Sequence, residues 1–96
     1  MADKAKHATN MLKALGHEGR LMILCYLVHG EKSVTELEDA LSLRQPAVSQ
    51  QLARLRADDI IEARRDGKAI YYSIKDERAA KIMEVVYELF CGPDAP

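Results

Sequence analysis

Apolar residues recur at helical spacing in five segments of the chain, and this spacing predicts five α-helices. They are expected at about residues 4–15, 18–28, 33–41, 46–56 and 76–91. The segment 18–28 is apolar on nearly every side, so we expect it to be the central buried helix of the fold. Gly16, Gly30 and the Gly92-Pro93 pair follow three of these segments and mark their ends.

The fourth of these helices, at 46–56, has two contrasting faces. Val48, Leu52 and Leu55 lie at positions i, i+4 and i+7 and form one apolar stripe. The opposite face carries small residues, an amide and an arginine: Pro46, Ala47, Gln50, Ala53 and Arg54. Small residues allow a helix to approach a surface closely, amides pair with adenine edges, and arginine pairs with guanine or phosphate. This face is therefore suited to the major groove of DNA.

The segment before this helix, residues 33–44, carries the signals of a short helix and a turn. Ser33 and Glu36 have the spacing of a capping box, so a short helix is expected to begin there and to continue to about Leu41. The turn 42–44 then leads directly into the helix at 46–56. Two helices joined by a tight turn, the second with a DNA-suited face, predict a helix-turn-helix.

A β-hairpin is expected immediately afterwards. Two runs rich in β-branched and aromatic residues, at 60–64 and 69–74, flank the sequence Arg65-Asp66-Gly67-Lys68. Asp-Gly between such runs is the strongest short signal for a hairpin. Because its tip is basic and follows a helix-turn-helix, we interpret it as a wing that contacts phosphates or the minor groove.

The residues expected to contact double-stranded operator DNA fall into two groups. Ser49 and Gln50 are expected at base edges, with Gln45 and Ala47 near the groove. The phosphate contacts are expected mainly from Arg44, Arg54, Arg65 and Lys68. Arg56 lies nearer the apolar stripe and is expected to pair within the protein.

Composition and charge limit the class of protein. Residues 1–96 are expected to form a single domain, ordered from about 4 to 91 between short polar tails. With 48% apolar and 30% charged residues, the chain is globular rather than disordered. Its net charge is only −1. Residues 44–68, however, include six basic and four acidic residues, and this local excess of positive charge permits DNA binding. The absence of a long apolar run or a signal peptide predicts a cytoplasmic protein without a membrane partner.

The last helix is too apolar for the surface of a lone small domain. Ile82, Val85, Val86 and Leu89 form a wide stripe along it. Together with the helix at 4–15, this stripe predicts the seam of a homodimer. A two-fold dimer would place two recognition helices about 34 Å apart, which is one turn of DNA. The expected fold is mainly α-helical with a β-wing, a winged helix-turn-helix.

This order of elements resembles the ArsR/SmtB family of winged-helix repressors. The segments 13–24, 47–55 and 65–72 look like its entry into the second helix, its recognition helix and its wing, and the likeness covers roughly residues 8–91. The resemblance implies a dimeric repressor, not an enzyme, that a ligand releases from DNA. It does not extend to the two metal sites of the family. The first of these metal sites uses cysteine thiols, but Ser33 and Thr35 stand at those positions here. At the second site, Arg78, Leu89 and Gly92 stand in place of three of the metal ligands. No metal or cofactor is therefore expected.

The two cysteines point to one branch of that family. The segments 21–25 and 87–91, which end at Cys25 and Cys91, look like the persulfide-sensing dithiol branch of SqrR and BigR type. In that branch the two thiols become linked by a disulfide or polysulfide bridge, and DNA is released. The resemblance thus implies that Cys25 and Cys91 are sensing thiols for inorganic or organic persulfides.

Other interpretations of the thiols remain open at this point. Cys25 is also compatible with a small buried apolar residue, and Cys91 with an incidental thiol near the end of the chain. The same thiols are candidate ligands in an ArsR-type sensor of arsenite, cadmium or zinc, completed by His7, His17 or His29. A thiol–disulfide enzyme lacks support because the sequence contains no CxxC. A winged helix that binds protein is the remaining alternative.

Overall fold

The computed structural model describes residues 1–41 and 45–92, without the side chains of Gln45 and Pro46. Its helices are α1 (Ala2–Leu15), α2 (Glu18–Leu27), α3 (Val34–Leu41), α4 (Gln45–Ala57) and α5 (Glu77–Cys91). Its strands are β1 (Lys32–Ser33), β2 (Ile61–Asp66) and β3 (Ala69–Ile74), which form one antiparallel sheet in the order β1-β3-β2. All five expected helices are present, although α1 begins at Ala2 rather than Lys4. None of the described helices is long and apolar enough to cross a membrane.

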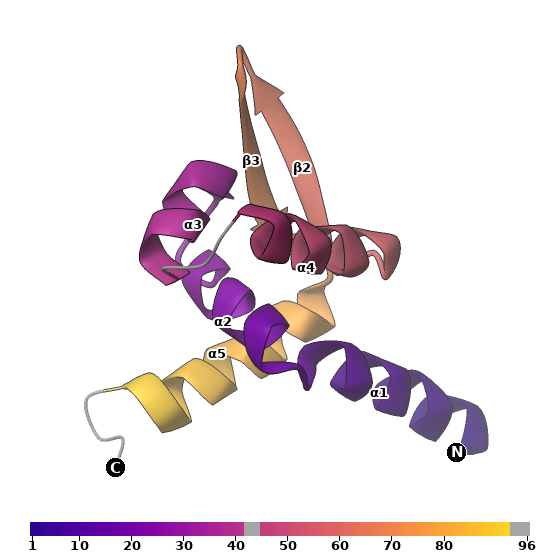
Figure 1. Ribbon diagram of the computed structural model, residues 1–96. Helices are drawn as coiled ribbons and strands as arrows, with labels where there is room; N and C mark the ends of the chain where they lie inside the picture. The colour runs from indigo at the N-terminus through magenta and orange to yellow at the C-terminus, as the bar shows by residue number, and fades with distance from the viewer. Residues whose placement is uncertain (42–44, 93–96) are drawn as a thin grey trace.

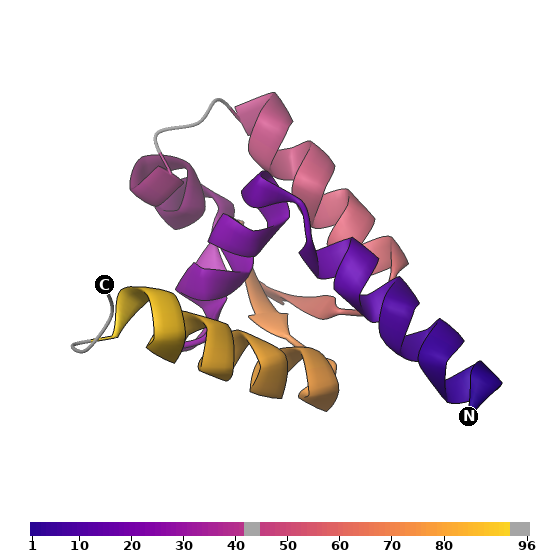
Figure 2. The same ribbon diagram turned by 90° about the horizontal axis from the view of Figure 1, so that it is seen from below.

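The elements are arranged around α2. Figure 1 shows the hairpin β2–β3 rising from the body of the molecule, with α4 across its base and with α1 and α5 diverging at the opposite end. Seen from below in Figure 2, α1 and α5 lie nearest the viewer and α2 lies behind them at the centre. The wing and the expected dimer helices α1 and α5 therefore extend from opposite sides of the domain.

The core is built from the apolar stripes that the sequence predicts. Val48, Leu52 and Leu55 of α4 are all buried and belong to one core cluster with Ile23 and Leu24 of α2. Helix α2 is central as expected, with Ile23, Leu24 and Leu27 buried, but one of its apolar faces is open to solvent. Met22 and Tyr26 are 38% and 40% exposed, because a domain of this size has too few elements to cover every side of a helix.

The start of α3 confirms the capping box and adds a strand that we did not expect. The Ser33 Oγ accepts a hydrogen bond from the Glu36 N–H at 3.1 Å, and the Glu36 Oε1 accepts one from the Ser33 N–H at 3.0 Å. The same segment pairs with β3 as the two-residue strand β1. The expected topology therefore lacked one strand, since two residues are too few to show an alternating pattern.

The wing matches the expected hairpin, with its turn shifted by one residue. Asp66 pairs with Ala69, so the loop consists of Gly67 and Lys68, and Gly67 adopts a φ of +64°. A positive φ at the first loop position suits the primed turns that fit the twist of a hairpin. Arg64 donates hydrogen bonds to the Glu31 carboxylate at 2.6 and 3.1 Å and lies 5.1 Å from the Tyr71 ring centroid. These contacts attach the wing to the segment before β1.

Asp76 caps α5, as the sequence indicated, and gives a testable pH dependence. Its carboxylate accepts hydrogen bonds from the N–H groups of Arg78 and Ala79 at 2.8 and 3.2 Å. The Arg78 side chain, followed by these backbone donors, holds the pKa of Asp76 below its ordinary value. A lowered pKa in the folded state means that the stabilisation is present above the unfolded-state value and is lost as the pH falls through the folded-state value.

We therefore expect Asp76→Ala to lower the free energy of unfolding by about 1 kcal/mol at pH 7, with the difference from wild type shrinking in acid below pH about 4. Urea denaturation between pH 7 and 2 measures both effects. Asp76→Asn is the matched control, because asparagine also caps helices but does not titrate. A constant difference between wild type and Asp76→Ala across this range would contradict the assignment.

Candidate DNA interface and thiol pocket

The face of α4 that the sequence assigned to DNA is open to solvent. Ala47, Ser49, Gln50 and Ala53 are exposed, on the side opposite the buried stripe. Arg44 lies outside the described residues, and Gln45 begins α4 with a side chain that is also outside them. The local geometry thus leaves small and amide side chains free to approach a surface.

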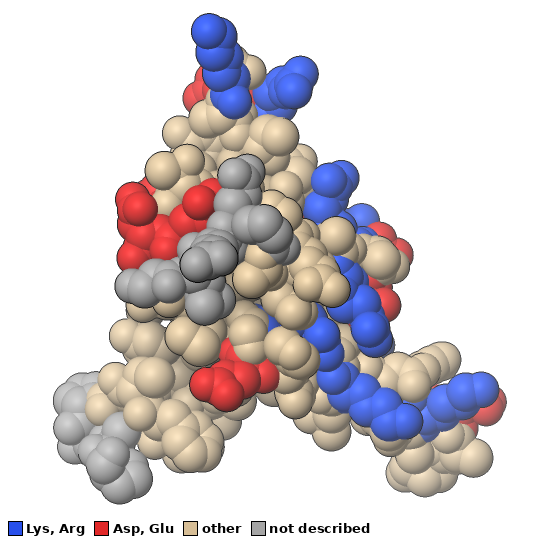
Figure 3. Space-filling model, viewed as in Figure 1, with Lys and Arg blue, Asp and Glu red and all other residues tan. Residues whose placement is uncertain are grey.

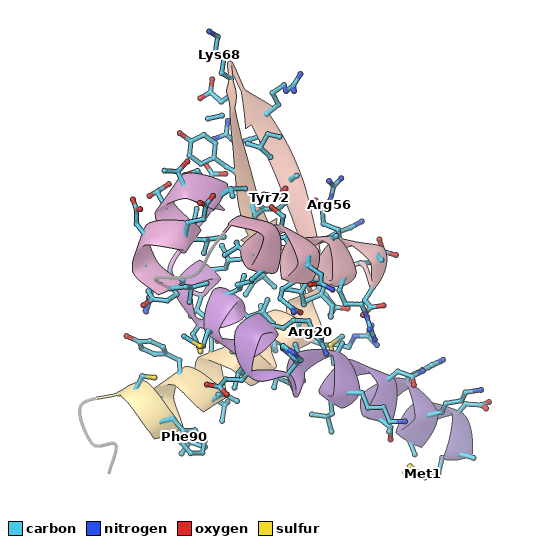
Figure 4. The ribbon with its side chains drawn as sticks, viewed as in Figure 1. Met1, Arg20, Arg56, Lys68, Tyr72 and Phe90 are labelled. Atoms are coloured by element: carbon cyan, nitrogen blue, oxygen red, sulfur yellow. The ribbon has the colours of Figure 1, made fainter. Side chains whose placement is uncertain are left out.

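Two arginines near the end of α4 are both exposed, but in different settings. The Arg54 Nε donates to the Asp58 carboxylate at 3.0 Å, an i,i+4 ion pair on the surface. Such exposed pairs are weak, so a DNA phosphate can compete with Asp58 for Arg54. The expectation that Arg56 pairs inside the protein is wrong. It is exposed, and Figure 4 shows its side chain extending outward beside the base of β2.

Charge is distributed unevenly over the surface. Arg65 and Lys68 are exposed at the tip of the wing, and Figure 4 shows Lys68 at its very end. In Figure 3, further basic side chains follow the flank of the molecule from the wing towards α1, whereas acidic ones gather over α3. A net charge of −1 therefore conceals a basic side on which α4 and the wing both lie.

Arg20 is a structural residue that the sequence analysis missed. From α2, its Nε donates to the Ala14 carbonyl at 2.6 Å, its Nη2 to the Lys13 carbonyl at 3.4 Å and its Nη1 to the Gln51 Oε1 at 3.2 Å. One guanidinium thus joins the end of α1, the start of α2 and α4, the expected recognition helix. The available signal was an arginine within an otherwise apolar helix, a position where an unpaired charge would be costly.

A close approach of two helices accompanies this contact. A Cβ added to Gly19 would lie 3.5 Å from the Gln51 Cγ and 3.2 Å from the His17 ring, so α2 passes close to α4 here. Gln51 is the neighbour of Gln50, one of the expected base contacts. Arg20 and Gly19 therefore position the residues that we expect at the groove.

Cys25 and Cys91 line the same pocket between α2 and α5. This pocket, called the thiol pocket below, has a volume of about 430 Å³ and is lined by Leu21, Met22, Cys25, Tyr26, His29, Tyr87 and Cys91. Both cysteines are free thiols, with Cys25 half-buried and Cys91 exposed. The rings of His29, just after α2, and Tyr87 of α5 meet edge to face, with 4.7 Å between their centroids. Two residues far apart in the sequence are thus neighbours in the fold.

The environment of the two thiols differs. Burial raises the pKa of the Cys25 thiol above its ordinary value, and the negative charge of a nearby Cys91 thiolate raises it further. Deprotonation at Cys25 is therefore disfavoured, while Cys91 is open to reagents in solution. Tyr26, on the pocket wall, donates a hydrogen bond from its hydroxyl to the Ala40 carbonyl of α3 at 3.3 Å. The pocket is thereby in contact with the first helix of the helix-turn-helix.

Large apolar side chains are exposed on the two helices opposite the wing. Leu12 of α1 is 58% exposed, and Val85, Leu89 and Phe90 of α5 are 54%, 59% and 72% exposed. Figure 2 shows both helices on one side of the domain. A single exposed leucine is ordinary, but several on neighbouring elements are typical of a surface that another molecule covers.

Metal ligands are not clustered in the part of the chain that the structure describes. Within residues 1–41 and 45–92, no group of three or more His, Cys, Asp and Glu side chains is placed to hold a metal ion. Arg78, which stands where the ArsR/SmtB family has a ligand on the last helix, forms an ion pair with Asp76 at 3.1 Å.

Comparisons with known proteins give a consistent result. Residues 17–63 match the family described as "Bacterial regulatory protein, arsR family". The chain is 44% identical over 94 residues to the biofilm growth-associated repressor of Agrobacterium fabrum, covering 98% of this chain and 80% of that protein. Reduced HlyU from Vibrio cholerae superposes with a TM-score of 0.92 at 36% identity, covering 95% and 96% of the two chains. The transcriptional repressor BigR from Xylella fastidiosa superposes with a TM-score of 0.89 at 42% identity, covering 100% and 95%. These matches confirm the winged helix-turn-helix fold.

Proposed function

Because this chain is a DNA-binding transcriptional repressor of the bacterial arsR family, we propose that it leaves its operator when a sulfur bridge links Cys25 to Cys91. The effectors are inorganic or organic persulfides, the working form is a homodimer, and the setting is the cytoplasm, where thiols rest reduced. The observation that carries this proposal is the shared thiol pocket, which both cysteines line.

The bridging reaction needs no oxidant other than the persulfide. A Cys91 thiolate attacks the terminal sulfur of RS–SH, the S–S bond breaks, and RS⁻ leaves and takes up the proton that the Cys91 thiol had released, so that Cys91 carries an added SH group. The exposure of Cys91 favours it as the first to react. The Cys25 thiolate then attacks the Cys91 Sγ and expels HS⁻. In total, two thiols and RSSH give one disulfide, RSH and hydrogen sulfide.

A polysulfide bridge follows from the same chemistry. If each thiol first receives a sulfur, the persulfide on one cysteine displaces HS⁻ from the other and leaves a trisulfide. A disulfide requires Cα atoms about 4.4–6.8 Å apart, and additional sulfur atoms extend that reach. The protein can therefore close the gap between α2 and α5 with a bridge of the length that the gap requires.

The bridge has two routes to the DNA-binding elements. It would fasten α5 to α2, and α5 carries the apolar face that we assign to the dimer, so it would alter the spacing of the two α4 helices. It would also disturb Tyr26, which contacts α3 through the Ala40 carbonyl. A coupling of about 1–3 kcal/mol is typical of such effects and corresponds to a change in affinity of about 5- to 150-fold.

The operator contacts follow the sequence assignment. We place Ser49 and Gln50 at base edges with Gln45 and Ala47 near them, and Arg44, Arg54, Arg65 and Lys68 at phosphates. Arg56 joins the candidate phosphate contacts, because it is exposed beside the wing.

Arg54→Ala should weaken operator binding and flatten its salt dependence, because one phosphate contact per protomer is lost. The slope of log K against log salt should fall in magnitude by about 0.9 for each lost contact. A titration of labelled operator at several salt concentrations measures both quantities. Lys81→Ala removes an exposed positive charge from α5 and is the control, with little change expected. An Arg54→Ala protein that binds DNA normally would favour a protein-binding role for the winged helix.

The proposed effector response is tested by operator affinity before and after treatment of the reduced protein with an organic persulfide. We expect weaker binding after treatment and recovery of binding after reduction with dithiothreitol. Unchanged affinity, starting from two intact thiols, would reject the persulfide response. Titration with arsenite, cadmium or zinc examines the alternative, since a thiolate-to-metal absorption band at stoichiometric metal would support a metal-sensing role instead.

A further inference from the structure

The thiol pocket differs from its surroundings in the residues that line it. Among the residues that the structure describes, 1–41 and 45–92, its lining contains no lysine, arginine, aspartate or glutamate. The larger pocket among α1, α4 and the start of α5, of about 520 Å³, is instead lined by several ionic residues, including Lys13, Arg54, Asp58, Asp76 and Arg78. The lack of ionic side chains is therefore a property of the thiol pocket and not of the surface in general.

A carboxylate substituent on the sulfur donor would find no lysine or arginine among these lining residues, and His29 is the one basic side chain there, with its ring already packed edge to face on Tyr87. A donor that brings its terminal sulfur to Cys91 from the pocket side, or to the half-buried Cys25, places its substituent against Met22, Tyr26 and Tyr87. A carboxylate in that position gives up part of its hydration without gaining an ion pair to a lysine or arginine of the lining. An apolar or aromatic substituent instead covers the exposed parts of the Met22 and Tyr26 side chains, which removes apolar surface from water.

We propose that the thiol pocket selects persulfides whose substituent is uncharged and apolar or aromatic, in preference to persulfides whose substituent carries a carboxylate. This inference rests on the proposed function, because it assumes that persulfides react at these thiols. It assigns a chemical class of effector to the pocket. The sulfur-transfer step is the one written above: Cys91 accepts the terminal sulfur and the substituted thiol RSH leaves.

Two reagents of nearly equal size test the selection. The reduced wild-type protein is treated with benzyl persulfide and, separately, with 4-carboxybenzyl persulfide, and mass spectrometry follows the loss of the two free thiols and the formation of the bridge. We expect the uncharged reagent to react about tenfold faster with the folded protein, since an unpaired carboxylate is costly to desolvate. In urea, where the pocket is absent, the two rates should agree within about twofold.

A variant at the rim of the thiol pocket tests whether the charge of the lining sets the ratio of the two reaction rates. Met22→Lys places a cation beside the thiols at an exposed position, and Ala57→Lys adds the same charge at the exposed end of α4 as a control. Because a nearby lysine also favours thiolate, the ratio of the two rates is the quantity to compare. Met22→Lys should reduce or invert the preference for the uncharged reagent, and Ala57→Lys should leave it unchanged.

Several outcomes would overturn the inference. Equal rates in the folded wild type, faster reaction of the carboxylate reagent, an equal preference in urea, or no effect of Met22→Lys on the ratio would each reject the selection by the pocket. In these cases the bridge still forms, so the proposed function stands. A failure of both reagents to link Cys25 to Cys91 would reject the inference and the proposed function together.

Discussion

Cys91→Ser should remain bound to the operator in the presence of a persulfide that lowers the affinity of the wild-type protein about 5- to 150-fold. The serine hydroxyl cannot accept a sulfur or close a bridge, so α5 stays free to move relative to α2. The remaining Cys25 is half-buried in the thiol pocket, where deprotonation is disfavoured. Fluorescence anisotropy of a labelled operator, with and without persulfide, measures the response of both proteins.

The reciprocal variant is the matched control for this experiment. Cys25→Ser leaves the exposed Cys91 able to take up sulfur but removes its partner, so modification without release of DNA is expected. Mass spectrometry confirms that the sulfur was added. If Cys91→Ser or Cys25→Ser is still released by persulfide to the same extent as wild type, the bridge is not the cause of release.

Leu89→Asp should convert the protein to a monomer and lower its affinity for an operator with two half-sites by about 100-fold or more. A dimer binds both half-sites at once, and a monomer loses the gain in affinity that comes from binding them together. Leu89 is 59% exposed among other apolar residues of α5. A carboxylate there would be buried without a partner in the dimer that we propose. Light scattering gives the mass in solution, and an operator titration gives the affinity.

Leu89→Met controls for the loss of the leucine shape while keeping the face apolar, and should remain dimeric. Because Leu89 is exposed in the single chain, Leu89→Asp should fold normally, which circular dichroism can verify. A dimeric Leu89→Asp protein with wild-type operator affinity would place the dimer interface elsewhere.

Much of the fold follows from patterns that are local in the sequence. The i, i+4, i+7 spacing of Val48, Leu52 and Leu55 determines which side of α4 is buried, and the structure buries these residues. The Ser33–Glu36 capping box involves residues three apart, and both of its hydrogen bonds are present. The hairpin is similarly determined by a two-residue turn between two β-forming runs. Each of these interactions is complete within a few residues, so sequence spacing is sufficient to predict it.

Features that depend on packing between distant segments were harder to predict. The strand β1 exists only because β3 lies beside it, and the exposed face of α2 exists because no other element covers it. Arg20 bonds to the end of α1 and to Gln51, which is 31 positions away along the chain. These contacts depend on how the helices dock against one another, which a repeating apolar pattern does not specify.

In the candidate site, too, some features follow from local sequence patterns and others from packing between distant segments. The exposed face of α4 follows from helical periodicity, whereas its contacts to operator DNA remain predictions. That Cys25 and Cys91 are neighbours was implied by resemblance to a family and not by their spacing, and the structure places both on one pocket. Arg56 was expected to pair within the protein because it lies nearer the apolar stripe, but a long arginine there reaches solvent.

Mass spectrometry of the reduced, full-length protein after exposure to an organic persulfide, with peptide mapping under non-reducing conditions, tests the central claim most directly. The account predicts a peptide pair joined through Cys25 and Cys91 of one protomer, by two or more sulfur atoms, that appears in parallel with the loss of operator binding. Release of DNA while both cysteines remain unlinked, or linkage only between different protomers, would contradict it.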